Sequence, residues 1–401
     1  MFRILHTSDW HLGHVLYNYS RADEQQHMLL QVEDYVRQYK PDALVVSGDI
    51  YHTAMPSAAT QRMFTDALLA IHRARPEMTI VITGGNHDSA SKLEIDRRLW
   101  LELGVHVLGR LQLTDSLEPD FESHIIRVAN KGLIAAVPHV YPQNFPPAGG
   151  DDRQAAFFAR LADEVAQRNS QQLPTVLMAH LTVTGSDLTG HSRLTDTVGT
   201  IDNVPLSALG EGYDYIALGH IHREQAVGIN ARYSGSPLAV SFDEDYPHSI
   251  TLVDIGDEIS VQQLPITNLH PLITVPADPV PFDEAIAALR QLPTDNCQLS
   301  TVNCQLSTPY VRLNILTDSG LPADAIEVAT AAAEESGCRF CTFKITRSTP
   351  LPSSAAYDDI TPDELKEMSP IDIARRFLQQ RGLPEDESIQ LLNDLISQHF
   401  Q

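Results

Sequence analysis

Residues 43–52, ALVVSGDIYH, place a run of strand-forming apolar residues directly before a glycine, an aspartate and a histidine. Glycine at the end of a strand lets the backbone turn sharply and aim the next side chains away from the sheet. The same order of apolar run and polar motif recurs at residues 2–11 (FRILHTSDWH), 79–88 (TIVITGGNHD), 175–180 (TVLMAH) and 215–222 (YIALGHIH). We therefore predict five strands that each end in a polar motif.

The stretches between the motifs have helical periodicity, at residues 21–39 and 58–74. Strands that alternate with helices predict an α/β fold for residues 1–268, with the motifs at the carboxyl ends of the strands, where sites gather in such sheets. Residues 232–237, 249–255 and 258–266 read as consecutive strands with a turn at Gly256-Asp257. We expect these later strands to form a second sheet packed against the first.

The motifs contain seven oxygen or nitrogen donors and no thiolate: Asp9, His11, Asp49, Asn86, His180, His220 and His222. Residues i and i+2 of a strand share one face, so Asp9 and His11 can bind one ion together. Each motif alone also fits a polar strand end or a satisfied core histidine, but the ordered combination suits two divalent cations with one shared carboxylate. Such pairs, about 3.5–4 Å apart, cleave phosphate esters.

The neighbouring residues indicate how the reaction could proceed. His87 lies beside a ligand but outside the ligand set, which suits a proton donor to the leaving oxygen. Asp88 can fix the tautomer of His87, or can serve as a helix N-cap or turn acceptor instead. Mixed imidazole, amide and carboxylate ligands suit manganese, iron or zinc better than magnesium alone.

Five segments carry a family resemblance: TSDWHLGH (7–14), SGDIYH (47–52), GGNHD (84–88), YDYIALGHIHREQ (213–225) and YSGSPLAVSFDE (233–244). With the lone His180 they resemble the calcineurin-like metallophosphoesterase superfamily and, within it, the SbcD family of nuclease subunits in bacterial DNA double-strand-break repair. The resemblance covers residues 1–268. It implies a two-sheet sandwich flanked by helices, with a dinuclear Mn²⁺ site.

The resemblance also implies roles for single residues. Asp9, His11 and His222 would hold the first ion, Asn86, His180 and His220 the second, and Asp49 would bridge both. His87, with Asp88 behind it, matches the family's catalytic histidine. His52 matches a further histidine near the scissile phosphate, although a loop histidine at the strand end explains His52 equally well.

The remaining chain predicts two further units. Residues 269–347 read as a small α+β module with helices at 282–291 and 323–336 and strands at 310–316 and 339–346, and the resemblance implies that it caps the site. Residues 348–401 read as a linker and a helical tail with apolar stripes, for example Leu391, Leu392 and Leu395, which suit docking on a partner. The resemblance implies that this partner is an SbcC-type coiled-coil ABC ATPase. NCQLST occurs twice within residues 296–308, and we interpret the copy as a loop insertion without function.

The net charge of −24 over 401 residues disfavours strong non-specific binding to duplex DNA by this chain alone. We expect a partner to contribute that affinity. No secretory signal and no apolar run of membrane-spanning length are visible, and four cysteines are too few for a disulfide framework, so we expect a cytoplasmic protein without membrane contact.

The favoured function is a metal-dependent DNA exonuclease and endonuclease subunit that cleaves phosphodiester bonds at double-stranded DNA ends and hairpins with an SbcC-type ATPase. The alternatives are a metallophosphoesterase for small or protein phosphoesters, and a non-catalytic scaffold of the same fold. A homodimer within a heterotetramer remains open at this point.

Overall fold

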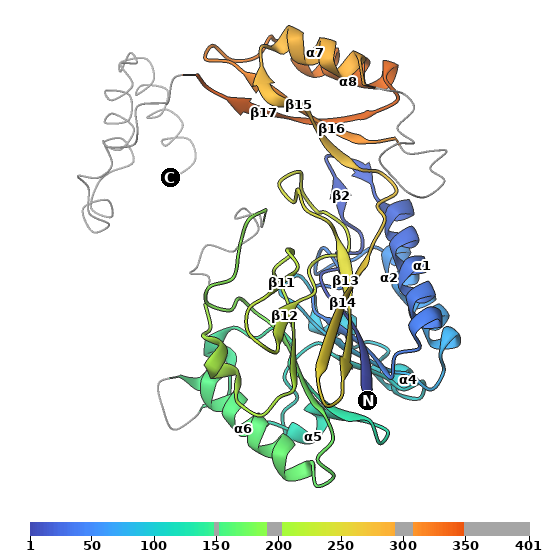
Figure 1. Ribbon diagram of the computed structural model, residues 1–401, viewed down its shortest axis with the longest axis vertical. Coiled ribbons are helices and arrows are strands. Elements are labelled where there is room, and N and C mark those ends of the chain that lie inside the picture. Colours follow the sequence, from blue (N-terminus) through green and yellow to red (C-terminus); the bar gives the residue numbers. More distant parts are fainter. Residues whose placement is uncertain (148–151, 191–202, 293–307, 349–401) are drawn as a thin grey trace, which may run out of the picture.

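Two six-stranded sheets pack face to face, and helices cover their outer faces (Figure 1). The computed structural model describes residues 1–147, 152–190, 203–292 and 308–348. The tail beyond Ser348 and the duplication that begins at Asn296 lie outside these ranges. No helix in the described ranges combines the length and the apolar character needed to cross a membrane.

The first sheet has the order β14-β13-β1-β4-β5-β6. Its parallel strands are β1 (Phe2–Thr7), β4 (Ala43–Ser47), β5 (Thr79–Thr83) and β6 (Val105–Leu108). The helices that connect its strands are α1 (Ala22–Tyr39), α2 (Ala58–Ala74), α3 (Ala90–Leu93) and α4 (Arg97–Leu101). Between β1 and α1 lies a short ribbon of β2 (Val15–Leu16) and β3 (Tyr19–Ser20). The bounds of α2 are those predicted, and α1 begins one residue after the predicted start.

The second sheet has the order β11-β12-β10-β9-β8-β7. Its strands are β7 (Ile125–Val128), β8 (Gly132–Ala136), β9 (Thr175–His180), β10 (Tyr215–Gly219), β11 (Gln225–Ala226) and β12 (Ala231–Tyr233). Helix α6 (Arg153–Arg168) packs on its outer face, and α5 (Phe121–His124) and the 3₁₀ turns η1 (Pro142–Asn144) and η2 (Leu206–Leu209) lie in its connections (Figure 1).

The expectation for residues 249–266 was wrong in one respect. Strands β13 (Ser249–Ile255) and β14 (Ile259–Pro265) form the predicted hairpin, but they extend the first sheet rather than build the second. β13 runs antiparallel to β1, with Phe2 opposite Ile255 and Leu5 opposite Leu252. A hairpin's sequence shows its own pairing but not which distant strand it will join.

The two faces of β4 explain why its sequence is apolar without interruption. Leu44 and Val46 belong to the core shared with α1 and α2, whereas Ala43 and Val45 belong to the core between the two sheets. A strand buried on both faces has no polar side. Full burial of each large apolar side chain contributes about 1.5–3 kcal/mol, so this sandwich holds the carboxyl ends of β1, β4, β5, β9 and β10 firmly together.

Residues 272–346 form a separate three-stranded parallel sheet with two helices, here called the cap (Figure 1). Its elements are β15 (Leu272–Val280), α7 (Phe282–Arg290), β16 (Tyr310–Leu316), α8 (Ala325–Glu335) and β17 (Arg339–Thr346). The two helices and the strands β16 and β17 lie where they were predicted. β15 was not predicted, because Pro276 and Pro279 weaken the signal of a strand. The cap has its own apolar core.

Candidate metal centre

The backbone turns sharply at the strand ends that carry the motifs. Asp9, His11, Asp49 and His220 adopt positive φ angles of 54°, 45°, 50° and 101°. Such conformations cost energy for residues other than glycine and persist where surrounding contacts hold them. Here the N–H of Asp9 donates to the carbonyl oxygen of Gly48, and the N–H of His11 donates to that of Asp49, both at 3.0 Å. The strained turns of β1 and β4 therefore support each other.

Two glycines allow the motifs to approach one another. A Cβ atom on Gly85 would lie 2.1 Å from Oδ1 of Asp49, and one on Gly48 would lie 2.1 Å from Nδ1 of His180. Any larger residue would collide with a proposed metal ligand. The glycines of the two motifs thus have a packing reason beyond making a turn.

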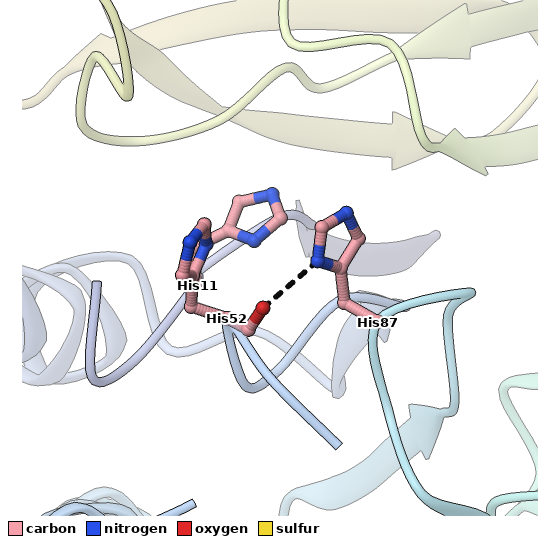
Figure 2. Close-up of side chains that lie close together, drawn as sticks. All are labelled: His11, His52 and His87. Carbon is pink, nitrogen blue, oxygen red and sulfur yellow. Dashed lines mark hydrogen bonds between the residues drawn. The ribbon is translucent and has the colours of Figure 1, made fainter. Parts of the chain in front are cut away.

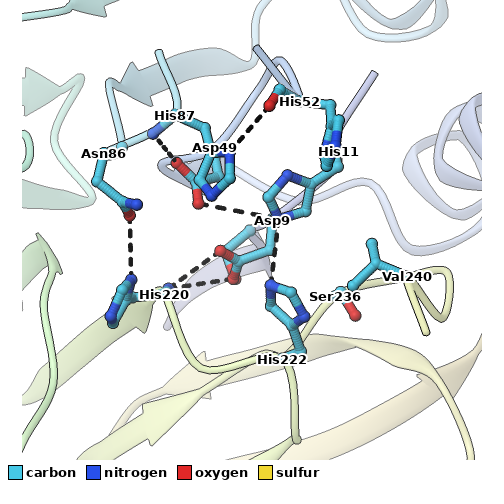
Figure 3. Close-up of polar contacts among 12 residues, drawn as sticks. Asp9, His11, Asp49, His52, Asn86, His87, His220, His222, Ser236 and Val240 are labelled. Atoms are coloured by element: carbon cyan, nitrogen blue, oxygen red, sulfur yellow. Dashed lines mark hydrogen bonds and ion pairs between the residues drawn. The ribbon is translucent and has the colours of Figure 1, made fainter. Parts of the chain in front are cut away.

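The first ligand group combines residues from both sheets. The ligand atoms of Asp9, His11 and His222 lie within 4.8 Å of one another, and all three side chains are buried. Nε2 of His11 lies 3.1 Å from Nε2 of His222 (Figure 3). Nδ1 of His222 donates to Oε1 of Glu244 at 2.9 Å, so the lone pair of Nε2 can point toward His11.

The second ligand group lies on the side of β9 and β10. The ligand atoms of Asp49, His180 and His220 lie within 4.8 Å of one another. Oδ1 of Asn86 is 3.0 Å from Nε2 of His180 and 3.1 Å from Nδ1 of His220 (Figure 3). Nδ1 of His180 donates to the carbonyl oxygen of Ser47 at 2.8 Å, which leaves Nε2 for a ligand.

Asp49 lies between the two groups. Its Oδ2 atom is 3.5 Å from Nε2 of His180 and 3.8 Å from Nε2 of His11. Its Oδ1 atom accepts the backbone N–H of His87 at 2.9 Å (Figure 3). One carboxylate is therefore within reach of both sets of histidines.

The chemistry of these donors fits bound cations. Lone-pair acceptors converge in both groups, and only a proton or a cation between them makes such an approach favourable. Burial lowers the pKa of His180, but Asp49 and Asp9 outweigh it and raise the pKa to about 9. For His222 the same opposition, with Glu244 as the main partner, raises the pKa to about 9. The buried carboxylates thus make a strongly negative cavity wall that divalent ions can neutralise.

His87 and His52 lie beside the first group. Nδ1 of His87 donates to the backbone carbonyl oxygen of His52 at 2.8 Å, and the two rings stack with centroids 5.6 Å apart (Figure 2). Burial and the neighbouring His87 lower the pKa of His52 to about 4. His11, His52 and His87 also form a cluster whose nitrogens lie within 4.8 Å, but this cluster contains no carboxylate.

The expected contact between Asp88 and His87 was wrong. The carboxylate of Asp88 instead accepts three backbone N–H groups, from Ile50 at 3.0 Å, Tyr51 at 2.9 Å and Gly85 at 2.9 Å. Burial and the charge of Asp49 raise the pKa of Asp88 to about 7, while the backbone donors oppose that rise. Asp88 therefore ties the loops after β4 and β5 together, as in the alternative interpretation of a turn acceptor.

Comparison with known proteins agrees with this geometry. Residues 2–224 match the family described as calcineurin-like phosphoesterase. The SbcD component of the SbcCD nuclease of Rhodobacter capsulatus is 32% identical over 378 residues, which cover 90% of this chain and 91% of that protein. The chain belongs to the calcineurin-like phosphoesterase family, in its SbcD branch.

Two further proteins are similar to this chain. The SbcD component of the Bacillus subtilis SbcCD nuclease is 32% identical over 288 residues, which cover 68% of this chain and 71% of that protein. A dimetal phosphatase from Danio rerio aligns with a TM-score of 0.40 and 13% identity, covering 67% of this chain and 99% of that one. As a calcineurin-like phosphoesterase of the SbcD branch, the chain is a metal-dependent hydrolase of a nuclease family.

The SbcD-type site includes residues that the sequence analysis missed. Glu244 is 5% exposed and orients His222, although 22 positions separate the two. The ring of His14 packs 4.5 Å from that of His52, and Nδ1 of His139 lies 3.2 Å from the carbonyl oxygen of His180. Glu244 lies in the segment SFDE that carried the resemblance, but no spacing rule connects it with His222.

Proposed function

We propose that this chain is a DNA nuclease subunit that cleaves phosphodiester bonds at duplex ends and hairpins together with an SbcC-type ATPase. The observation that carries the proposal is the position of Asp49 between two ligand groups, with His87 beside them. The relatives named as SbcD components of SbcCD nucleases, which match over most of the chain, support the choice of DNA and of the ATPase.

We propose Mn²⁺ as the metal and two ions as the stoichiometry. Asp9, His11 and His222 would hold one ion, Asn86, His180 and His220 the other, and Asp49 both. Neutral imidazoles, an amide oxygen and carboxylates together suit Mn²⁺ better than an all-oxygen site would. When bound, the ions supply positive charge at the phosphoryl oxygens and lower the pKa of the attacking water.

The protein's own contribution to bond cleavage is proton transfer from His87. Its Nδ1 atom is held by the carbonyl oxygen of His52, which fixes the plane of the ring. A protonated His87 can then deliver the proton on Nε2 to the leaving sugar oxygen. His52 lines the same wall, and we assign its ring a role in contacting the scissile phosphate.

A cation held by His11, His52 and His87 is the competing arrangement. Three neutral imidazoles bring no negative charge to offset the cost of burying a divalent ion. The group of Asp9, His11 and His222 supplies a carboxylate from a side chain that is 1% exposed. We therefore place the ion with Asp9, which leaves His87 for proton transfer.

The partner is proposed from charge as well as from the relatives. Duplex binding depends on neutralising phosphates, and a chain with a net charge of −24 is poorly suited to do so alone. An ATPase that carries basic surface would supply this affinity. We propose that residues 348–401 dock on it and that residues 269–347 cap the site.

The test is a digestion assay with Mn²⁺ on linear duplex, hairpin DNA and a small phosphodiester, each with and without the ATPase. We expect the chain alone to hydrolyse the small diester, and the complex with ATP to degrade both DNA substrates. Hydrolysis confined to phosphomonoesters or phosphoproteins would favour the general phosphoesterase. No hydrolysis of any substrate, with metal bound, would favour the non-catalytic scaffold.

A further inference from the structure

Strand β16 of the cap carries two side chains that reach across to the sandwich. Tyr310 and Arg312 are two positions apart and so share one face of the strand. Nη1 of Arg312 donates to Oδ1 of Asp243 at 2.6 Å, and Nη2 donates to the carbonyl oxygen of Phe242 at 3.1 Å. The guanidinium carbon also lies 5.2 Å from the centre of the Phe242 ring. One cap arginine thus grips two consecutive residues of the sandwich.

The gripped residues immediately precede Glu244, which orients a proposed metal ligand. Oε1 of Glu244 accepts Nδ1–H of His222 at 2.9 Å. Oε2 accepts the N–H of Val240 at 3.2 Å and the hydroxyl of Ser236 at 3.3 Å, and both residues lie on the His222 side of the site (Figure 3). The segment is folded around the Glu244 carboxylate, so a shift of residues 242–243 would shift the support of His222.

A second route starts at Tyr310 and ends near the same place. The Tyr310 hydroxyl donates to Oε2 of Glu24 at 3.0 Å, and Glu24 is held by Arg21 through Nε at 2.8 Å. Arg21 is 2% exposed, and its Nη1 donates to the carbonyl oxygen of Ala239. The same Nη1 lies 3.3 Å from Nδ1 of His14, the ring that packs on His52. A buried charged pair of this kind requires a defined geometry, because an unpaired partner would be costly.

Both routes end on the side of Asp9, His11 and His222. We propose that Tyr310 and Arg312 are positioning residues through which the seating of the cap sets the affinity of this one ion. The proposal rests on the dinuclear site proposed above. Since coupling is reciprocal, binding of that ion would also hold the cap in place. Any ligand that displaces the cap, such as a duplex end, would thereby act on the metal site.

The experiment measures Mn²⁺ binding to the full chain by titration calorimetry, with Arg312→Gln as the test. We expect one of the two ions to bind roughly ten-fold to a hundred-fold more weakly, the usual effect of losing support behind a ligand, and the other to bind as before. The matched control is Arg290→Gln, which removes a cap arginine whose Nε lies 3.1 Å from Glu335 on the exposed surface. This variant should bind both ions normally.

Asp243→Ala removes the same ion pair from the sandwich side, where the carboxylate is 68% exposed, so it tests the proposal even if Arg312→Gln does not fold. The double variant should bind Mn²⁺ no more weakly than either single variant, because all three lose one contact. Unchanged affinity for both ions, or an equal loss for both, would overturn the coupling. An unmodified chain that fails to bind two ions would instead overturn the proposed function.

Discussion

Nδ1 of His87 lies 2.8 Å from the backbone carbonyl oxygen of His52. A carbonyl oxygen can only accept, so this nitrogen carries a proton in either charge state of the ring. The second proton, on Nε2, is then the one that can move. The loop after β4 therefore fixes the direction in which a histidine of the loop after β5 can act.

Replacement of His87 separates proton transfer from metal binding. His87→Ala should retain two Mn²⁺ ions and slow diester cleavage by roughly a hundred-fold or more, the scale of a lost general acid. Metal analysis and turnover on the same sample provide the measurement. A variant that loses an ion would instead support the three-histidine site, and one that keeps its rate would remove the catalytic role.

Replacement of Asp49 should abolish the metal pair. Asp49→Ala removes the one carboxylate that reaches both histidine groups, so we expect loss of metal stoichiometry together with all cleavage. Asp34→Ala, which removes a side chain that is 73% exposed on α1, is the control and should behave as the unmodified chain does. Two bound ions with near-normal turnover in Asp49→Ala would contradict the shared-ligand assignment.

A single methyl group at Gly85 should disrupt the site. The added Cβ of Gly85→Ala would lie 2.1 Å from Oδ1 of Asp49, so the carboxylate or the loop must move. We expect weaker Mn²⁺ binding and at least a ten-fold loss of turnover. Gly256→Ala, in the β13–β14 turn with only one atom near the added Cβ, at 3.9 Å, is the control. Equal Mn²⁺ affinity in both variants would show that the approach of Gly85 to Asp49 is not required.

The tail can be tested by deletion. Removing residues 361–401 should leave metal binding and small-diester hydrolysis intact, because every proposed ligand precedes residue 223. The deletion should abolish association with the ATPase and ATP-stimulated degradation of duplex DNA. Leu392→Asp should act similarly, since it puts an unpaired charge on an apolar stripe. A shortened chain that still co-purifies with the ATPase would refute the docking site.

The duplex affinity of the isolated chain provides a further measurement. We expect it to be weak and to fall with added salt, and to rise sharply once the ATPase is bound. Filter binding or fluorescence anisotropy at two salt concentrations would measure this. Tight duplex binding by the chain alone would refute the argument from its net charge.

Local sequence patterns predicted the elements and the gathering of the motifs. The apolar run before Asp49 and the periodicity of residues 58–74 each reflect burial of the element itself, so they can be recognised without knowledge of the rest of the fold. Contacts between distant segments could not be predicted in this way. Asp88 contacts three backbone groups rather than His87, and Glu244 reaches His222 across 22 positions.

The position of β13 has a consequence for how the chain reaches its folded state. β1 carries the first ligand motif and lies between β4 and β13, with five residues paired to the latter. A nascent chain that has been synthesised only as far as residue 224, where the family match ends, leaves one backbone edge of β1 open. Open edges recruit strands from other molecules. The smallest fragment protected from this kind of aggregation therefore extends to Pro265, the end of the hairpin.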